Sequence, residues 1–166
     1  MSDVPRIDRP HMPGYGVRPA SEGTGLLAWE WALQHLVASH DYWLATAGSD
    51  RRPHLMPVWA VWLDEALWFS CSNRSRKTRN LRTEPRCSLA TDNPQQLVVA
   101  EGAAEVVADQ PNLRRMLDAE NTKYGTDYGV DMLDRAANTC FRVRPTWVFA
   151  LDAADFTGSP TRYRFG

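Results

Sequence analysis

Residues 52–81 read RPHLMPVWAVWLDEALWFSCSNRSRKTRNL, and this stretch decides the fold. An apolar run over 53–63 is followed by Asp64-Glu65 and a second apolar run over 67–71, a pattern that predicts a β-hairpin. Both alternating faces of the first strand are apolar, because tryptophan, valine, alanine and leucine follow one another without a polar interruption. We therefore expect a central strand that is buried on both sides.

The chain on either side of this hairpin adds more strands than helices. Apolar spacing predicts a helix over 26–39 that starts near Thr24, together with helices over 75–83, 112–124 and 131–137. Further strands are expected over 42–46, 87–91, 97–107, 139–151 and 161–166. Short turns join most of these strands, so the expected fold is mainly β, an antiparallel barrel with peripheral helices.

Length and charge limit the function classes. A chain of 166 residues is one domain, and we expect an irregular, Pro- and Gly-rich arm over 1–25 followed by a folded domain over 26–166. Its 19 Lys and Arg nearly balance its 20 Asp and Glu, for a net charge of −1. A dedicated nucleic-acid or anionic-membrane binder needs a basic surface, so we expect neither partner.

Cysteine spacing and hydropathy point to the compartment. The three cysteines form no CxxC pair and no metal-binding spacing, so we expect neither disulfides nor a metal site. The first 20 residues lack the apolar core of a signal peptide, and no apolar run is long enough to span a membrane. These features predict a cytoplasmic protein.

The window over 74–86 carries most of the local positive charge. It holds six basic side chains and only one acidic side chain, Glu84, within a chain of net charge −1. One interpretation is a solvated helix face. The alternative is an anion site, because the window begins where a strand ends and a helix opens through Asn73 and Ser75. Hydroxyl groups together with Arg76 and Lys77 would then form a phosphate cradle without a glycine-rich loop.

Five segments in series resemble the pyridoxamine 5′-phosphate oxidase-like split-barrel superfamily. They are RPHLMPVW at 52–59, LWFS at 67–70, SRKTRNL at 75–81, EPRCSL at 84–89 and VAEGAAE at 99–105. The resemblance extends over about 29–151 and is strongest to the flavin/deazaflavin oxidoreductases of actinobacteria (the F420-dependent B branch). It implies a six-stranded antiparallel split β-barrel, and a homodimer with cofactor at the subunit interface.

The resemblance also assigns roles to individual residues. Arg76 and Lys77 would hold the cofactor phosphate, with help from Ser72, Ser75 and Asn80. The backbone of Met56, Pro57, Val58 and Trp59 would run along the tricyclic ring, and Ser70 and Cys71 would line the ribityl chain. No catalytic residue is assigned.

The implied activity is transfer of a hydride from reduced coenzyme F420 to a small unsaturated or heteroaromatic substrate. Two alternatives stay open, namely an FMN-dependent oxidoreductase and a non-catalytic protein that binds flavin, F420 or haem. Vitamin B6 oxidation is disfavoured, because Leu97 stands where pyridoxamine phosphate oxidases proper keep a glutamine and their C-terminal Arg-x-His motif is missing.

Overall fold

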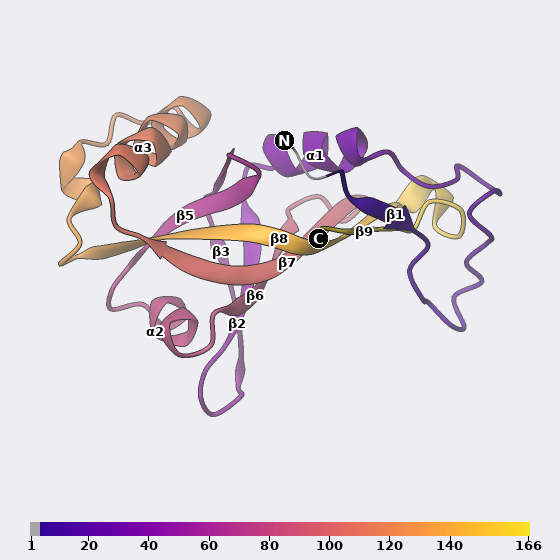
Figure 1. The fold of residues 1–166 in the computed structure, drawn as a ribbon, viewed down its shortest axis with the longest axis horizontal. Helices are drawn as coiled ribbons and strands as arrows, with labels where there is room; N and C mark the ends of the chain where they lie inside the picture. The colour runs from indigo at the N-terminus through magenta and orange to yellow at the C-terminus, as the bar shows by residue number, and fades with distance from the viewer. Residues whose placement is uncertain (1–3) are drawn as a thin grey trace.

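The computed structural model of the chain describes residues 4–166, and it confirms a mainly β fold of the split-barrel type. The described residues contain nine strands rather than the six that the family resemblance implies, and every strand pair is antiparallel. The strands are β1 (Arg6–Asp8), β2 (Tyr42–Ala47), β3 (Pro53–Val58), β4 (Val61–Leu63), β5 (Ala66–Ser72), β6 (Arg86–Thr91), β7 (Gln96–Val107), β8 (Asn138–Asp152) and β9 (Thr161–Arg164). Figure 1 shows them as one curved sheet.

The order of the strands explains the split in the barrel. The main path runs β1-β9-β8-β7-β6-β2-β3, while β5 pairs with β8 and with β4. Strand β3 pairs with β2 alone, and no ladder of the described residues joins β3 to β5. The sheet is therefore open between these two strands, and the outer edge of β3 presents unpaired backbone groups.

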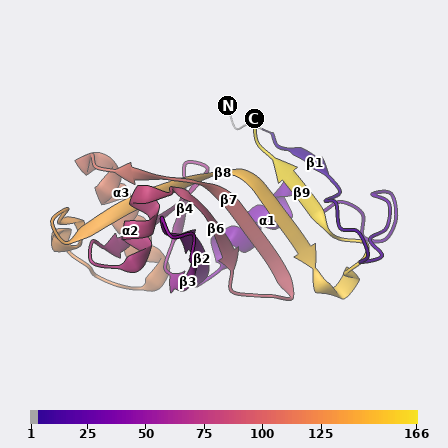
Figure 2. The ribbon, with the colours of Figure 1, turned by 90° about the horizontal axis from the view of Figure 1, so that it is seen from below.

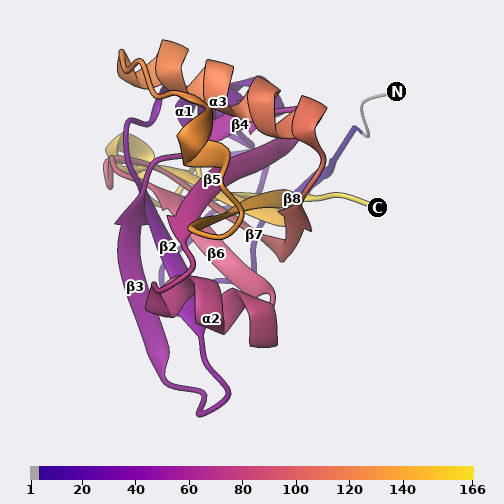
Figure 3. The same cartoon turned by 90° about the vertical axis from the view of Figure 1, so that its left-hand side faces the viewer.

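Three helices lie around the sheet, namely α1 (Trp29–Ala38), α2 (Arg76–Thr83) and α3 (Gln110–Tyr124), with short 3₁₀ turns η1 (Val130–Leu133) and η2 (Ala153–Asp155). Helices α2 and α3 lie on opposite sides of the strands (Figure 3). The helix expected over 75–83 is confirmed, while the one expected over 131–137 is only the 3₁₀ turn η1. Helix α3 begins two residues before the expected start, because Asp109 caps it and Pro111 fits its first turn.

The prediction of one continuous strand over 53–63 is wrong. The strand ends at Val58 and resumes at Val61, and the first half pairs with β2 while the second half pairs with β5. Strand β3 is consequently an exposed edge strand and not a central one, with Leu55 56% and Met56 42% exposed. The backbone of Ala60 bonds to side chains of α3 instead of to a neighbouring strand, which separates the two halves.

Two expectations near the N-terminus also need correction. Helix α1 starts at Trp29 rather than 26, and Ala28 occupies its N-cap position without a side-chain hydrogen bond. Thr24 instead bonds through its amide and its hydroxyl to Asp155. The expected irregular arm contains strand β1, because Asp8 pairs with two arginines of β9 and holds the arm against the sheet (Figure 2).

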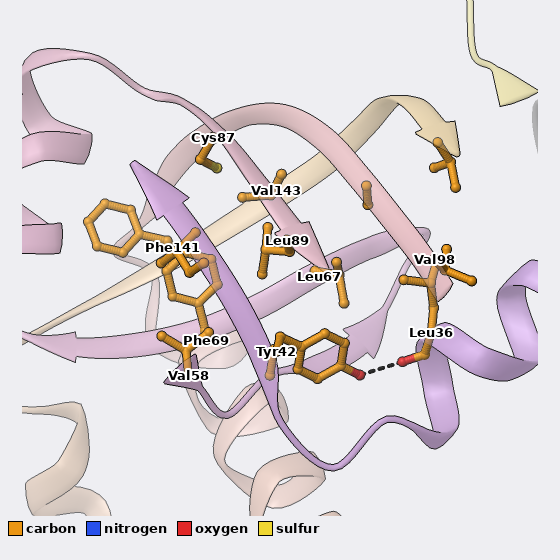
Figure 4. Packing of buried hydrophobic residues seen from close by; sticks show 14 of the residues in the cluster. Leu36, Tyr42, Val58, Leu67, Phe69, Cys87, Leu89, Val98, Phe141 and Val143 are labelled. Atoms are coloured by element: carbon orange, nitrogen blue, oxygen red, sulfur yellow. Dashed lines mark hydrogen bonds between the residues drawn. The ribbon is translucent and has the colours of Figure 1, made fainter. Parts of the chain in front are cut away.

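The core fills the inside of the barrel. Phe69 and Phe141 face each other from β5 and β8, with ring centroids 5.6 Å apart, and Leu89 lies beside them (Figure 4). The buried phenol of Tyr42 donates to the carbonyl of Leu36, which ties β2 to the end of α1 (Figure 4). A second, smaller cluster forms on the other face of β5 beneath α3, around Trp68 and Met116. Two of the expected cofactor residues, Val58 and Cys71, belong to the first cluster.

Candidate functional site

The N-terminus of α2 is built by local hydrogen bonds. Ser75 is the N-cap, and its Oγ accepts from the amide of Thr78 at 3.2 Å. The Thr78 hydroxyl donates to the carbonyl of Ser72 at 2.9 Å, which fixes the end of β5 against the helix. The amides of Arg76 and Lys77 have no helical acceptor, as in the first turn of every α-helix. These free donors and the positive end of the helix favour an anion.

Arg76 and Lys77 extend this site with two cationic side chains. Within residues 4–166, neither of them forms an ion pair with a carboxylate. Burial lowers the pKa of His54 on β3, and the positive charges of Arg76 and Lys77 lower it further. Burial raises the pKa of the Cys71 thiol to about 11, against the opposing charge of Lys77. Both cations therefore act on His54 of β3, and Lys77 also acts on Cys71 of β5.

The remaining expected phosphate residues have structural partners. The Oγ atom of Ser72 accepts from the amide of Arg74 at 3.2 Å, and the hydroxyl of Ser75 donates to Thr78 at 2.9 Å. Asn80 is buried, and its amide nitrogen donates to Oγ1 of Thr46 on β2 at 3.0 Å. Asn80 therefore anchors α2 to the sheet, on the side of the helix that faces the barrel.

Ser70 and Cys71 do not share a surface. Successive side chains of a strand point to opposite faces. Cys71 belongs to the first core cluster inside the barrel, whereas Ser70 lines a cavity of about 360 Å³ beneath α3, together with Glu120 and Cys140. At most one of the two side chains can line any one groove. The assignment of both residues to the ribityl chain stays a prediction.

The segment from Met56 to Trp59 follows the free edge of the sheet. The segment leads into the break between β3 and β4. Two residues of α3 hold the chain there, and the sequence analysis assigned neither of them to a site. The Lys123 ammonium donates to the carbonyl of Ala60 at 2.8 Å, and the Tyr124 hydroxyl accepts from the Ala60 amide at 2.9 Å. The Trp59 indole stacks on the Tyr124 ring. The sequence signal for this anchor is the Lys123-Tyr124-Gly125 segment, which is typical of a helix end. The left-handed conformation of Gly125 shows that α3 ends there.

The described part of the chain holds neither a membrane-spanning helix nor a metal-type cluster. No helix of residues 4–166 is both long and apolar enough to cross a bilayer. The same residues contain no group of three or more His, Cys, Asp and Glu side chains suited to a metal ion.

An antiparallel split barrel with a cationic helix terminus next to the end of β5 defines the class of small split-barrel β proteins. The sequence pattern of the pyridoxamine 5′-phosphate oxidase family matches residues 32–152, and the chain belongs to that family. The resemblance seen in the sequence is thereby confirmed. No curated protein sequence matches the chain.

Solved structures share the fold. A conserved hypothetical protein of Mycobacterium tuberculosis, Rv2991, is 25% identical with a TM-score of 0.67, and the match covers 84% of this chain and 91% of that one. A structure described as an F420 reductase is 27% identical with a TM-score of 0.55, covering 66% of this chain and 89% of the other. A heme binding protein from Mycobacterium smegmatis is 20% identical with a TM-score of 0.59, covering 78% of this chain and 60% of that protein.

Proposed function

We propose that the protein is an F420-dependent reductase that transfers a hydride to a small unsaturated or heteroaromatic substrate and acts as a homodimer. The observation that carries the proposal is a pair of cations at the N-terminus of α2, Arg76 and Lys77, that form no ion pair within residues 4–166. A cofactor phosphate would supply the anion that these groups lack among the described residues. Similarity to a structure described as an F420 reductase supports the deazaflavin over other phosphorylated rings.

The donor set suits a phosphate. Two adjacent amides, one guanidinium and one ammonium belong to the first turn of α2, shortly after the end of β5, and these are the groups that bind phosphate at helix termini. Their positive charge would be neutralised by the bound anion. The bound anion would also offset the positive charge that lowers the pKa of His54.

The free edge of β3 would orient the ring system. Met56 to Trp59 lie at a strand edge without a neighbouring strand, so backbone groups are available to a flat ligand. Lys123 and Tyr124 hold the end of this segment at Ala60, which limits its movement when a ligand binds. When bound, reduced F420 supplies the hydride. The protein contributes orientation of the ring and exclusion of water from its surroundings.

An exposed apolar face supports the homodimer. Strand alternation places Trp43, Ala45, Leu55 and Ala90 on the outer face of β2, β3 and β6. The side chains of Trp43 and Leu55 are 45% and 56% exposed. Apolar patches of this kind mark interaction surfaces. A second copy packed here would lie directly beside the free edge of β3 and would enclose a ring bound there.

Fluorescence titration tests the cofactor proposal. The protein is titrated with F420, with FMN and with haemin, and F420 is expected to bind at micromolar concentration and more tightly than FMN. Arg76→Ala and Lys77→Ala should each weaken F420 binding by about tenfold or more, since each removes a charge-assisted bond. Arg114→Ala, an exposed arginine of α3, is the matched control and should change nothing.

The contrary outcomes are distinct. Failure of F420 and FMN to bind contradicts the cofactor site. If FMN binds more tightly than F420, the proposed site stands and FMN is its cofactor. Tight haemin binding without F420 binding would favour the haem-binding alternative, in line with the similar fold of the heme binding protein.

Dimer formation is tested by light scattering, where Trp43→Arg should yield a monomer.

A further inference from the structure

A cavity of about 650 Å³ lies apart from the proposed cofactor site. It is formed where both ends of the chain meet α1 and the β4–β5 turn, the region in which β1, β9 and α1 come together in Figure 1. None of the eleven residues expected to bind the cofactor lines this cavity. Its volume falls within the range of small-molecule sites.

Three aromatic side chains form its apolar wall. Trp29 lies between Trp62 and Phe165, with ring centroids 6.3 Å and 5.1 Å away and interplanar angles of 58° and 73°. All three line the cavity and remain partly exposed. Tilted rings around a cavity present π-faces and edges to a ligand, an arrangement suited to a flat or cationic molecule.

The charged groups of the cavity are mainly acidic. Three carboxylates line it, from Glu30, Glu65 and Glu105, against the single guanidinium of Arg144. Arg144 lies 3.6 Å from Glu65, and Glu105 pairs with Arg142 at 2.5 Å. Glu30 forms no ion pair within the described residues, so its carboxylate is available to a ligand. The field in the cavity therefore favours a cation.

We propose that this cavity is a second small-molecule site that binds an organic cation with an aromatic body, such as a protonated arylalkyl amine. The rings of Trp29, Trp62 and Phe165 would contact the body of the ligand, and Glu30 would contact its ammonium group. The inference does not depend on the cofactor proposal, since the two sites share no residue.

Three probes with the same ring test the charge preference. They are 1-naphthylmethylammonium, the uncharged 1-naphthylmethanol and the anion 1-naphthoate, each measured by equilibrium dialysis against the full chain. The cation should bind about fivefold more tightly than the alcohol, and the anion most weakly. Glu30→Gln should reduce the difference between cation and alcohol to less than about twofold, while Glu22→Gln, an exposed control, should preserve it.

The location is tested by NMR of the tryptophan indole N–H groups. The cation should shift the Trp29 and Trp62 signals, assigned from Trp29→Phe and Trp62→Phe, and leave that of Trp43 unchanged. Lys77→Ala should bind the cation as the unmodified protein does, even if it loses the cofactor. The proposal is overturned if no probe shifts the Trp29 and Trp62 signals at millimolar concentration, or if the anion binds as tightly as the cation.

Discussion

The indole of Trp59 lies flat on the phenol ring of Tyr124, with ring centroids 4.2 Å apart and planes 5° apart. This stack joins the break between β3 and β4 to the last turn of α3. The Tyr124 hydroxyl adds bonds to both backbone groups of Ala60, at 2.9 Å and 3.0 Å. The end of the strand edge that we propose for the cofactor ring is thus held by a helix residue 64 positions further along the chain.

Removing the hydroxyl of Tyr124 should weaken this junction without removing the stack. Tyr124→Phe leaves the Ala60 amide without its partner, so we expect a loss of about 1–3 kcal/mol in the free energy of unfolding. Tyr124→Leu should cost about 0.5–1.5 kcal/mol more, because the aromatic contact is lost as well. Urea unfolding followed by circular dichroism gives both values. Equal stability of the phenylalanine variant and the unmodified protein would contradict the role of the hydroxyl.

The neighbouring Lys123 should make stability depend on pH. Burial lowers its pKa from 10.5 to about 8, while its ammonium bonds to Tyr42 and Ala60. Between about pH 8 and 10.5 the unfolded chain holds the Lys123 proton and the folded protein does not, so stability rises with pH in that window. The free energies of unfolding of the unmodified protein and Lys123→Met are compared from pH 7 to 10. Subtracting one from the other removes the contribution of the titrating groups that the two proteins share. A constant difference would contradict the shift.

Gly102 should tolerate no side chain. It lies at the irregular register step of β7, and a Cβ there would come 2.5 Å from the Arg144 carbonyl oxygen and 3.0 Å from a methyl group of Val143. Gly102→Ala should therefore destabilise the protein by roughly 1–3 kcal/mol. Gly129→Ala is the matched control, because no atom lies within 4 Å of the added Cβ. Thermal unfolding should separate the two variants, and similar midpoints would contradict the steric argument.

Asp8 should hold β1 against β9. Its carboxylate accepts from Arg162 and from Arg164, each at 2.6 Å. The hydrogen bond from Arg162 lowers the pKa of Asp8, burial opposes it, and Arg164 lowers it further. The stabilisation is thus present above the unfolded pKa of 3.8 and is lost as the pH falls below it.

Hydrogen exchange measures this attachment. Asp8→Asn should speed amide exchange in β1 and β9 at pH 7, while exchange in β6 stays unchanged. Lowering the pH should also weaken the unmodified protein more than the variant. Unaltered protection of β1 would show that the backbone ladder suffices without the carboxylate.

Asn80 should contribute to the free energy of unfolding even in the absence of cofactor. Its buried amide donates to Thr46, so Asn80→Ala should lower the unfolding free energy by about 1–3 kcal/mol even without cofactor. Arg76→Ala, on the same helix, should leave that energy within about 0.5 kcal/mol of the unmodified value, because its side chain is partly exposed and forms no ion pair with any described residue. Urea unfolding without ligand makes the comparison. Equal stability of Asn80→Ala and the unmodified protein would contradict this structural role.

Local patterns were sufficient for much of the fold and for part of the candidate site. Alternating apolar residues identified most strands, and Ser75 with the run that follows it identified α2 and its cap. The resemblance carried by several short segments predicted the family, which the match over residues 32–152 confirms. These features depend on residues close together in the chain, so a single sequence reveals them.

Features that depend on distant residues escaped prediction. The break at Trp59 and Ala60 requires Lys123 and Tyr124 to arrive from α3, and strand β1 requires arginines more than 150 residues away. The buried orientation of Asn80 follows from its contact with Thr46 on β2. Such partners have no marker in the local pattern.

The sequence by itself determined a mainly β protein with a cationic helix terminus next to an apolar hairpin, because strand alternation, helix capping and local charge are encoded in neighbouring residues. Only the tertiary structure decided which strand edge stays free, which of Ser70 and Cys71 faces the barrel, and where the ends of the chain enclose an aromatic cavity. Each of these depends on contacts between elements that are far apart in sequence, and such contacts form only when the sheet closes on its core.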